Sequence, residues 1–336
     1  MKRLLLALFA LAIAEPAVAQ DKLVVSIWGG SWRDLVADTA AKKFTQETGV
    51  PVEFITGGTI DRLNKANLAK GNPESDITFT TSHVGWLYAN SALFEKLDLG
   101  KIPNAKNLVD EARISPFHLG SWAYIYTIGY RTDLIKDIKF DSWTDLWKPE
   151  LKGKIAAPDF DPSHIIVVSA LLSGGDAEHW QKGEARLKAL KPSFKAFYTD
   201  DANSQQLLAS GETPVQDVLS MNAYYMIGQG APITVAIPKE GGVLGVDAVA
   251  MAGSKKSDLA HEFINALYDP EVQAAIAKQK KGSPVVLNAK LDPDTAKLPG
   301  VFTSVAQWKQ QINIDPKLRA EKLPEWRKWF AENIMN

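Results

Sequence analysis

One carboxylate in this sequence lies where a charge is costly. Asp247 is set in the apolar run from Val243 to Met251, and burying an ionised carboxylate without a partner is strongly unfavourable. The segment therefore predicts a cationic or hydrogen-bonding partner for Asp247. The ammonium group of a ligand, held in a partly desolvated cleft, would be such a partner, because charge-assisted hydrogen bonds are strong there.

Two aromatic residues near the N-terminus suit the same kind of cation. Trp28 and Trp32 flank the pair Gly29-Gly30, which lets the backbone approach a ligand closely. An indole face over a desolvated cation contributes up to about 2 kcal/mol. Both tryptophans are candidate ligand contacts. The alternative for Trp32 is that it begins an amphipathic helix and packs in the core.

Other candidates lie in loops that follow predicted strands, which is where open parallel sheets bind their ligands. The further ligand-binding candidates from these loops are Ser31, Ser82, His83, Trp122, Asp159 and Ser163. The serines open predicted helices, so capping is the simpler interpretation, although helix N-termini also bind anions. Asp161, directly before Pro162, is expected to cap a helix. A ligand with both an ammonium and a carboxylate would use both kinds of group.

The sequence carries no pattern of a known enzyme or metal centre. It has no GxSxG elbow, HExxH helix, Walker loop or GxGxxG fingerprint, and its five histidines are scattered. It also has no cysteine, which excludes disulfides and thiolate chemistry. We therefore expect a binding protein without catalytic residues, metal or cofactor.

The main alternative involves the adjacent tyrosines in Asn222-Ala223-Tyr224-Tyr225. They resemble the phenolate pair of periplasmic ferric-binding proteins, which would make Tyr224 and Tyr225 iron ligands. The other interpretation is that one ring faces the core and the other lines an interdomain cleft, since both rings have apolar bodies. On that interpretation Tyr224 is a candidate contact for an organic ligand.

Predicted strands alternate with predicted helices along the chain. The strands are expected at 23–27, 52–55, 76–79, 124–130, 154–157, 196–198 and 213–218. The helices are expected at 32–48, 61–70, 82–93, 163–172, 204–209, 259–267 and 270–280. This alternation predicts an α/β protein with mostly parallel sheet covered on both faces. The strands after residue 122 are expected to form a second sheet, separate from the first, in a second domain.

The N-terminus has the pattern of an export signal. Lys2 and Arg3 precede an apolar run from Leu4 to Ala14, and Ala17-Val18-Ala19 makes a small-residue cleavage site. The run is shorter than the roughly 18 residues that span a bilayer, so we expect residues 1–19 to be a signal peptide and no membrane anchor. The 38 basic and 39 acidic residues are balanced, which indicates no nucleic-acid partner.

Two segments carry a family resemblance: Ser142 to Lys154, with the sequence SWTDLWKPELKGK, and Pro238 to Gly242, with the sequence PKEGG. They resemble the periplasmic polyamine-binding proteins that feed ABC importers, as do the GQGAPI turn and Tyr268-Asp269-Pro270. The resemblance implies a two-lobed periplasmic binding protein fold of type II, closing by a hinge over its ligand. It also implies a monomer that delivers its solute to an inner-membrane ABC permease.

The resemblance carries over to single residues. Asp247 matches the aspartate that holds an amine, Trp28 an aromatic of the amine box, and Ser82 a polar contact. Two departures weaken other amine contacts: Gly245 replaces a tryptophan, and Phe160 and Ser163 lie where a spermidine binder has a carboxylate pair. The expected ligand is putrescine or a spermidine-like polyamine, or a ligand with one ammonium and an acid, such as an ω-amino acid (GABA, for example) or an aminophosphonate.

Asp247 is expected at a point where the chain crosses between lobes, because no flexible linker separates the two runs of strand-helix units. The predicted first lobe comprises residues 20–121 and 246–305. The predicted second lobe comprises residues 122–245 and 306–336.

Overall fold

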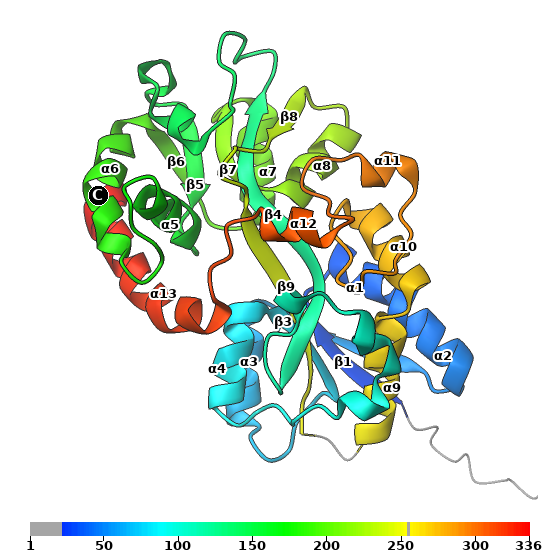
Figure 1. The fold of residues 1–336 in the computed structure, drawn as a ribbon. Helices are drawn as coiled ribbons and strands as arrows, with labels where there is room; N and C mark the ends of the chain where they lie inside the picture. Colours follow the sequence, from blue (N-terminus) through cyan, green and yellow to red (C-terminus); the bar gives the residue numbers. More distant parts are fainter. Residues whose placement is uncertain (1–21, 254–255) are drawn as a thin grey trace, which may run out of the picture.

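The structure is a computed structural model that describes residues 22–253 and 256–336 (Figure 1). The predicted signal peptide at 1–19 lies outside the described residues. Within the described ranges, no helix is both long and apolar enough to cross a membrane. The chain folds into an α/β structure in which strands and helices alternate, as the sequence predicts.

Nine strands form the central sheet. They are β1 (Leu23–Ile27), β2 (Val52–Thr56), β3 (Ile77–Thr81), β4 (His118–Arg131), β5 (Ile155–Pro158), β6 (Phe194–Tyr198), β7 (Val215–Leu219), β8 (Ile233–Ala236) and β9 (Val243–Met251). Their spatial order is β2-β1-β3-β9-β4-β7-β5-β6, with β8 also paired to β4. The pairs β1–β2, β1–β3, β5–β6 and β5–β7 are parallel, whereas β4 and β9 run antiparallel to their neighbours.

Two long strands, β4 and β9, join the halves of the molecule. β9 pairs with β3 on one edge and with β4 on the other, and the far end of β4 pairs with β7 and β8. Hydrogen bonding therefore runs through the whole sheet, and the expectation of two separate sheets is wrong. In Figure 1 β4 and β9 pass from the lower half, with β1 and β3, to the upper half, with β5 to β8. The residue bounds of the two lobes stay a prediction.

Helices flank the sheet in both halves. In Figure 1 α3 and α4 lie to one side of the lower strands and α2 and α9 to the other, while α5 to α8 surround the upper strands. The helices are α1 (Ser31–Val36), α2 (Lys42–Thr48), α3 (Thr59–Leu68), α4 (Ser82–Asn90), α5 (Ser163–Leu171), α6 (Glu184–Leu190), α7 (Asp201–Ser210), α8 (Ser220–Gly228), α9 (Ser257–Leu267), α10 (Pro270–Lys280), α11 (Pro293–Ala296), α12 (Val305–Lys309) and α13 (Pro316–Phe330). A π-helical stretch, Ala37–Ala41, joins α1 to α2. Short 3₁₀ turns cover Leu99–Lys101, Pro103–Asn107, Asp110–Ala112, Trp143–Trp147, Pro149–Leu151, Trp180–Gly183 and Lys191–Ser193.

Local sequence explains where several helices begin and end. Gly49 has a left-handed φ of 73° and terminates α2, as the sequence predicts. The side chain of Asp200 accepts a hydrogen bond from the backbone of α7 and so caps its first turn. Asp269 does the same for α10, with Pro270 in the first helical position. The Asp200 cap fixes the loop from β6 into α7, and the Asp269 cap fixes the turn between α9 and α10.

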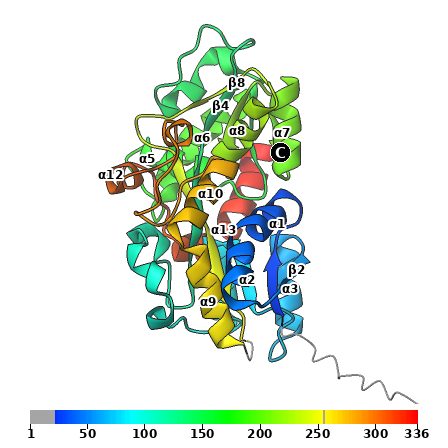
Figure 2. The ribbon, with the colours of Figure 1, turned by 90° about the vertical axis from the view of Figure 1, so that its right-hand side faces the viewer.

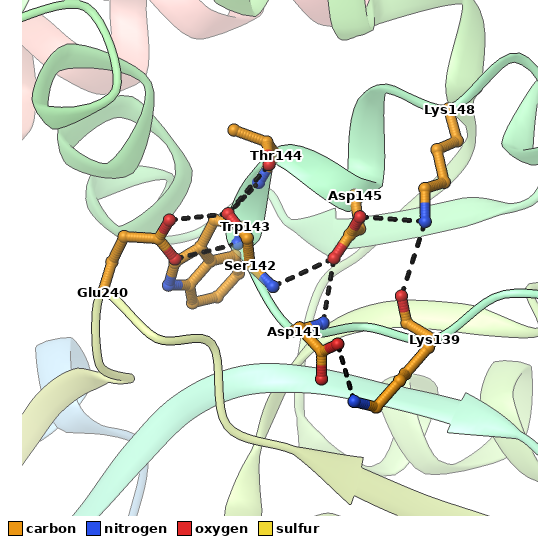
Figure 3. Close-up of polar contacts among 8 residues, drawn as sticks. All are labelled: Lys139, Asp141, Ser142, Trp143, Thr144, Asp145, Lys148 and Glu240. Carbon is orange, nitrogen blue, oxygen red and sulfur yellow. Dashed lines mark hydrogen bonds and ion pairs between the residues drawn. The ribbon is translucent and has the colours of Figure 1, made fainter.

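The two segments that carry the family resemblance bind each other, as Figure 3 shows. The Glu240 carboxylate accepts hydrogen bonds from the Ser142 hydroxyl at 2.6 Å and from the Trp143 backbone at 3.1 Å. The Trp143 indole donates to the Gly241 carbonyl at 2.8 Å. Glu240 lies in a turn, and its carboxylate joins two segments almost a hundred residues apart. Trp143 is fully buried, so this cluster stabilises the second half.

The C-terminal helix α13 contacts both halves of the molecule (Figures 1 and 2). It packs against α4 of the lower half and α5 of the upper half. Lys317 lies over the Trp86 ring at 5.8 Å, whereas Trp329 packs edge-on against Trp180 at 5.3 Å. A segment far along the chain therefore lies beside the boundary between the halves, where it supplies side chains to the site described next.

Candidate ligand-binding site

A cavity of about 540 Å³ lies between the two halves. Its walls come from the loops after β1, β3, β5 and β6, from the starts of α3 and α4, from β4 and β9, and from α13. Parallel strands end at this boundary, which is where α/β sheets bind ligands. The charged and aromatic lining residues are Trp28, Trp32, Asp61, His83, Tyr124, Tyr126, Phe160, Asp161, Asp200, Asp201, Asp247, Arg319 and Arg327.

Asp247 lies at the centre of the cavity's sheet wall. It pairs with Thr81, the last residue of β3, and with Trp122 on β4, so it lies on one of the two strands that join the halves. Oδ2 accepts a hydrogen bond from the Trp122 indole at 2.8 Å, and Oδ1 accepts one from the Tyr124 hydroxyl at 3.0 Å. Among the described residues no lysine, arginine or histidine forms an ion pair with it. Burial therefore raises the pKa of Asp247 to about 7, against the smaller lowering effect of these two bonds.

Gly245 makes room for the tyrosine that holds Asp247. A side chain at this position would begin 2.1 Å from Cε2 of Tyr124, which is far inside van der Waals contact. The Tyr124 ring therefore occupies the space beside the aspartate. Gly245 thus allows an aromatic ring from β4 to lie next to Asp247.

Tryptophans form a second wall. The rings of Trp28 and Trp32 lie 6.2 Å apart, and Trp32 stacks on Trp122 at 5.4 Å. Trp28 is fixed by a 2.7 Å hydrogen bond from its indole nitrogen to the Thr59 hydroxyl. Protein cations already lie over these rings: Arg62 over Trp28 at 5.2 Å and Lys280 over Trp32 at 4.2 Å. The wall is therefore an aromatic surface whose two rings already contact cations.

A buried polar cluster forms the opposite side, where α13 meets α5 and α4. Arg319 donates from Nη2 to Asp161 at 2.5 Å and approaches His164 at 2.7 Å, while His83 lies 3.7 Å from Asp161. Burial would raise the pKa of Asp161, but Arg319 and the histidines hold that pKa well below its usual range. Burial, with a further contribution from Arg319, lowers the pKa of His83 to about 3, so His83 is neutral at pH 7.

The structure separates the predicted ligand-binding residues into those that line the cavity and those that do not. Those that line the cavity are Trp28, Trp32, Ser82, His83 and Asp247. Trp122 is fully buried behind the wall and reaches the site through its bond to Asp247. Whether these side chains contact a ligand stays a prediction.

The remaining predicted residues do not line this cavity. The Ser31 hydroxyl accepts a hydrogen bond from Lys280 at 2.7 Å, and Asp159 lines a separate hollow beside α13. Ser163 is fully buried, with its backbone donating to Asp161 at 3.1 Å. The N-cap position of α5 is held by Pro162 and not by Asp161 as expected. The Asp161 carboxylate instead accepts from the backbone of Ser163, the first residue of α5, and binds Arg319.

The two tyrosines of the iron alternative lie apart from the cavity. The Tyr224 hydroxyl donates to the Pro299 carbonyl at 2.7 Å, and Tyr225 is 58 % exposed. In the part of the chain that the structure describes, no group of three or more acidic or histidine side chains is arranged to hold a metal. The ferric-binding alternative is not favoured.

Sequence reasoning missed several lining residues, notably Arg319 and Arg327 of α13 and Tyr124 and Tyr126 of β4. The arginines follow Asp247 by some seventy to eighty residues in a polar helix, and nothing in their spacing connects them to the cleft. The tyrosines belong to a predicted strand, and the alternation along it was a usable signal, because residues two apart share one face of a strand.

The charges of the lining residues favour a cation. Five aspartates line the cavity against two arginines, and Arg319 is already paired with Asp161. Asp201 accepts a hydrogen bond from the Asn222 amide at 2.8 Å, and burial raises its pKa. The unpaired excess is negative and concentrates on Asp247, Asp200 and Asp201.

The fold and the cleft define the class of this protein. A two-lobed α/β structure with a cavity between halves joined by β4 and β9 is the architecture of a periplasmic binding protein. The sequence profile of the bacterial extracellular solute-binding proteins matches residues 39–303, and the chain belongs to that family. It is the solute-binding component of an ABC importer, and the permease of such an importer is its partner.

Several relatives match over most of their length. The spermidine/putrescine-binding periplasmic protein of Salmonella typhimurium is 27% identical over 335 residues, covering 92% of this chain and 93% of the relative. The putrescine/cadaverine-binding protein of Pseudomonas aeruginosa is 26% identical over 304 residues, covering 83% of each chain. The resemblance to polyamine-binding proteins is confirmed at the level of the family.

Solved structures match the fold closely. An ABC transporter structure from Clostridium perfringens is 27% identical with a TM-score of 0.81, covering 93% of this chain and 100% of that one. A structure described as the Atu4243-GABA receptor has a TM-score of 0.80 at 24% identity, covering 94% of this chain and 98% of that one. The predicted two-lobed fold class is confirmed.

Proposed function

We propose that the protein captures a small amine-bearing solute, with the ammonium group against Asp247 and the indoles of Trp28 and Trp32. The observation that carries the proposal is the buried Asp247 carboxylate, whose only hydrogen-bond donors among the described residues are neutral side chains. These donors orient both carboxylate oxygens but carry no charge. The ammonium group of a ligand would supply the positive charge that the Asp247 carboxylate lacks in the folded chain. Relatives named for spermidine, putrescine and cadaverine support the same class of solute.

The other end of the solute has two candidate environments. The excess of aspartates, with Asp200 as the N-cap of α7 and Asp201 as its first residue, favours a second ammonium, as in putrescine or a longer polyamine. Arg327 and the cavity face of Arg319 favour an acid, as in an ω-amino acid or an aminophosphonate. The described fold resembles a protein named as a GABA receptor as closely as the others, which supports testing both classes.

Binding is coupled to closure of the two halves. Residues from both halves line the cavity, so a solute contacting Asp247 and Asp200 or Arg319 is bound more tightly in the closed form, and the permease distinguishes that form. We propose that the protein is exported by residues 1–19, acts in the periplasm as an unanchored monomer, and releases its solute chemically unchanged. Hinge movement about β4 and β9 is the simplest route, since among the strands of the described residues only these two are shared by both halves of the sheet.

A screen tests the proposal directly. Purified protein is melted with putrescine, cadaverine, spermidine, GABA and 2-aminoethylphosphonate, and the best ligand is titrated by calorimetry. A ligand at 100 times its dissociation constant adds about 2.7 kcal/mol to the free energy of unfolding, so at least one amine is expected to raise the melting temperature. Proton NMR of the recovered amine is expected to show no product. Failure of every amine to stabilise the protein, or turnover of one, contradicts the proposal.

A further inference from the structure

A second cavity, of about 160 Å³, lies in the first half of the molecule, away from the cleft. It is bounded by α3, α4 and the ends of β1 and β3, with the turn from Gly71 to Ser75 at its mouth. Its volume is roughly ten times the 10–15 Å³ that a single water needs. It shares none of its lining residues with the cleft, although Arg62 also lies over the Trp28 ring of the cleft wall.

The guanidinium of Arg62 lines this cavity and has an unmet polar group. Arg62 is only 5 % exposed. Its Nε donates to the Gly57 carbonyl at 3.0 Å, and Nη1 donates to the Phe79 carbonyl at 2.7 Å and approaches the Ser26 hydroxyl at 3.3 Å. Nη2 is buried with no hydrogen-bond partner. Within residues 22–253 and 256–336 no carboxylate forms an ion pair with Arg62, so a buried cation lacks an anion, which is an unfavourable arrangement.

The other charged residues that line this cavity are mostly basic. Lys65 and Lys70 lie at the mouth, and Glu74 is the one acidic residue among the lining residues. Tyr88, which is 2 % exposed, also lines the cavity, and its hydroxyl has no hydrogen bond to another described residue. Burial raises the pKa of Tyr88 to about 12 while the nearby Arg62 charge opposes that rise, so the phenol remains a neutral donor. A guanidinium and a phenol that line the same cavity suit an oxyanion.

We propose that this cavity binds a small oxyanion, such as phosphate, sulfate or a carboxylate, which accepts hydrogen bonds from Arg62 Nη2 and the Tyr88 hydroxyl. Lys65 and Lys70 attract the anion to the mouth. The anion neutralises a charge that is otherwise buried alone, and it ties α3 to α4. The cavity lies outside the cleft, but Arg62 also lies over the Trp28 ring of the cleft wall, so Tyr88 and Lys65 are the residues that test the anion site separately from the cleft.

The test uses the full exported protein saturated with the best amine from the screen, so that the cleft is closed to the probe. If no amine binds, the same titrations are run on ligand-free protein. Inorganic phosphate and sulfate are titrated separately by calorimetry, and melting is followed against sodium chloride at equal ionic strength. Saturable binding is expected, with a melting temperature that rises with phosphate or sulfate and not with chloride.

Variants locate the anion. Arg62→Met is expected to weaken phosphate binding by at least 10-fold, and Tyr88→Phe and Lys65→Gln by about 3-fold each. Tyr130→Phe and Lys297→Gln, which make the same chemical changes outside the cavity, are expected to bind phosphate as the parent does. If Arg62→Met fails to fold, Tyr88→Phe still tests whether phosphate binds in this cavity, because it keeps the aromatic ring and removes only the hydroxyl. The proposal is overturned if phosphate and sulfate stabilise no more than chloride, which would make this a water-filled cavity, or if Tyr88→Phe and Lys65→Gln both bind phosphate normally.

Discussion

Trp122 and Asp247 face each other on neighbouring strands, with the indole Nε1 of one donating to the carboxylate Oδ2 of the other at 2.8 Å. Trp122 in turn stacks on Trp32 and on Phe79, each at 5.4 Å between ring centroids. The carboxylate is thus fixed by aromatic packing rather than by a counter-charge. An aspartate held in this way is oriented for a cation that the protein itself does not supply.

The pH dependence of stability is expected to report this unpaired carboxylate. Because the folded protein holds the pKa of Asp247 at about 7, above its ordinary value of 3.8, the unfolded chain binds fewer protons between these values. The free energy of unfolding therefore falls as pH rises from about 4 to 7, by up to roughly 4 kcal/mol at about 1.4 kcal/mol per pKa unit. Ligand-free Asp247→Asn is expected to lack this decline in urea unfolding at pH 4.5 to 8, and equal slopes for the two proteins would contradict the assignment.

Arg319 is expected to be required for stability, unlike the neighbouring arginine on the same helix. Arg319→Met leaves the buried Asp161 carboxylate without its closest cation, and breaking such a pair typically costs about 3–5 kcal/mol. Arg327→Met removes the same chemistry from an exposed position, where changes usually stay within about 0.5 kcal/mol. Denaturant unfolding of both variants makes the comparison. Similar stabilities for the two would show that the Asp161–Arg319 pair is not structural.

Gly245 is expected to tolerate no side chain. Gly245→Ala brings a methyl group against the Tyr124 ring, and such overpacking typically costs about 1–3 kcal/mol. It also moves the Tyr124 hydroxyl away from Asp247, so amine affinity should fall together with stability. Gly228→Ala, at a helical glycine with open space around it, is the control and should be neutral or slightly stabilising. Unchanged stability and affinity in Gly245→Ala would mean that the ring moves aside freely.

The hydrogen bonds of Glu240 to Ser142 and Trp143, which join the two segments that carry the family resemblance, are expected to affect stability and not amine affinity. Glu240→Gln weakens the acceptor for the Ser142 hydroxyl and the Trp143 backbone, for which a loss of about 1–3 kcal/mol is typical. Amine affinity should be unchanged, since none of these residues lines the cleft. Glu150→Gln, at an exposed position, serves as the control. A change in affinity as large as the change in stability would place this cluster in ligand binding instead.

The sequence predicted the alternation of strands and helices from the periodic spacing of hydrophobic residues, which is a local signal. It also predicted that Asp247 is buried and needs a partner, because a single acidic residue in an apolar run is a local signal too. Trp28 and Trp32 were found for the same reason, since they flank a glycine pair. Arg319 was missed because its position depends on how α13 returns across both halves, which no local pattern encodes. The continuous sheet was missed too, because strand lengths alone do not show that β4 and β9 pair with partners in both halves.

The most direct measurement of the central claim is calorimetric titration of Asp247→Asn with the amine that the parent binds best. This variant keeps the shape of the side chain and removes the charge, and truncating one member of a buried charge pair typically costs about 2 to 5 kcal/mol. We predict that the dissociation constant rises by roughly 30-fold to several thousand-fold, while Asp258→Asn, an exposed position outside the cleft, binds as the parent does. Binding by Asp247→Asn within about threefold of the parent would contradict the account, because the ligand's ammonium would then have another partner.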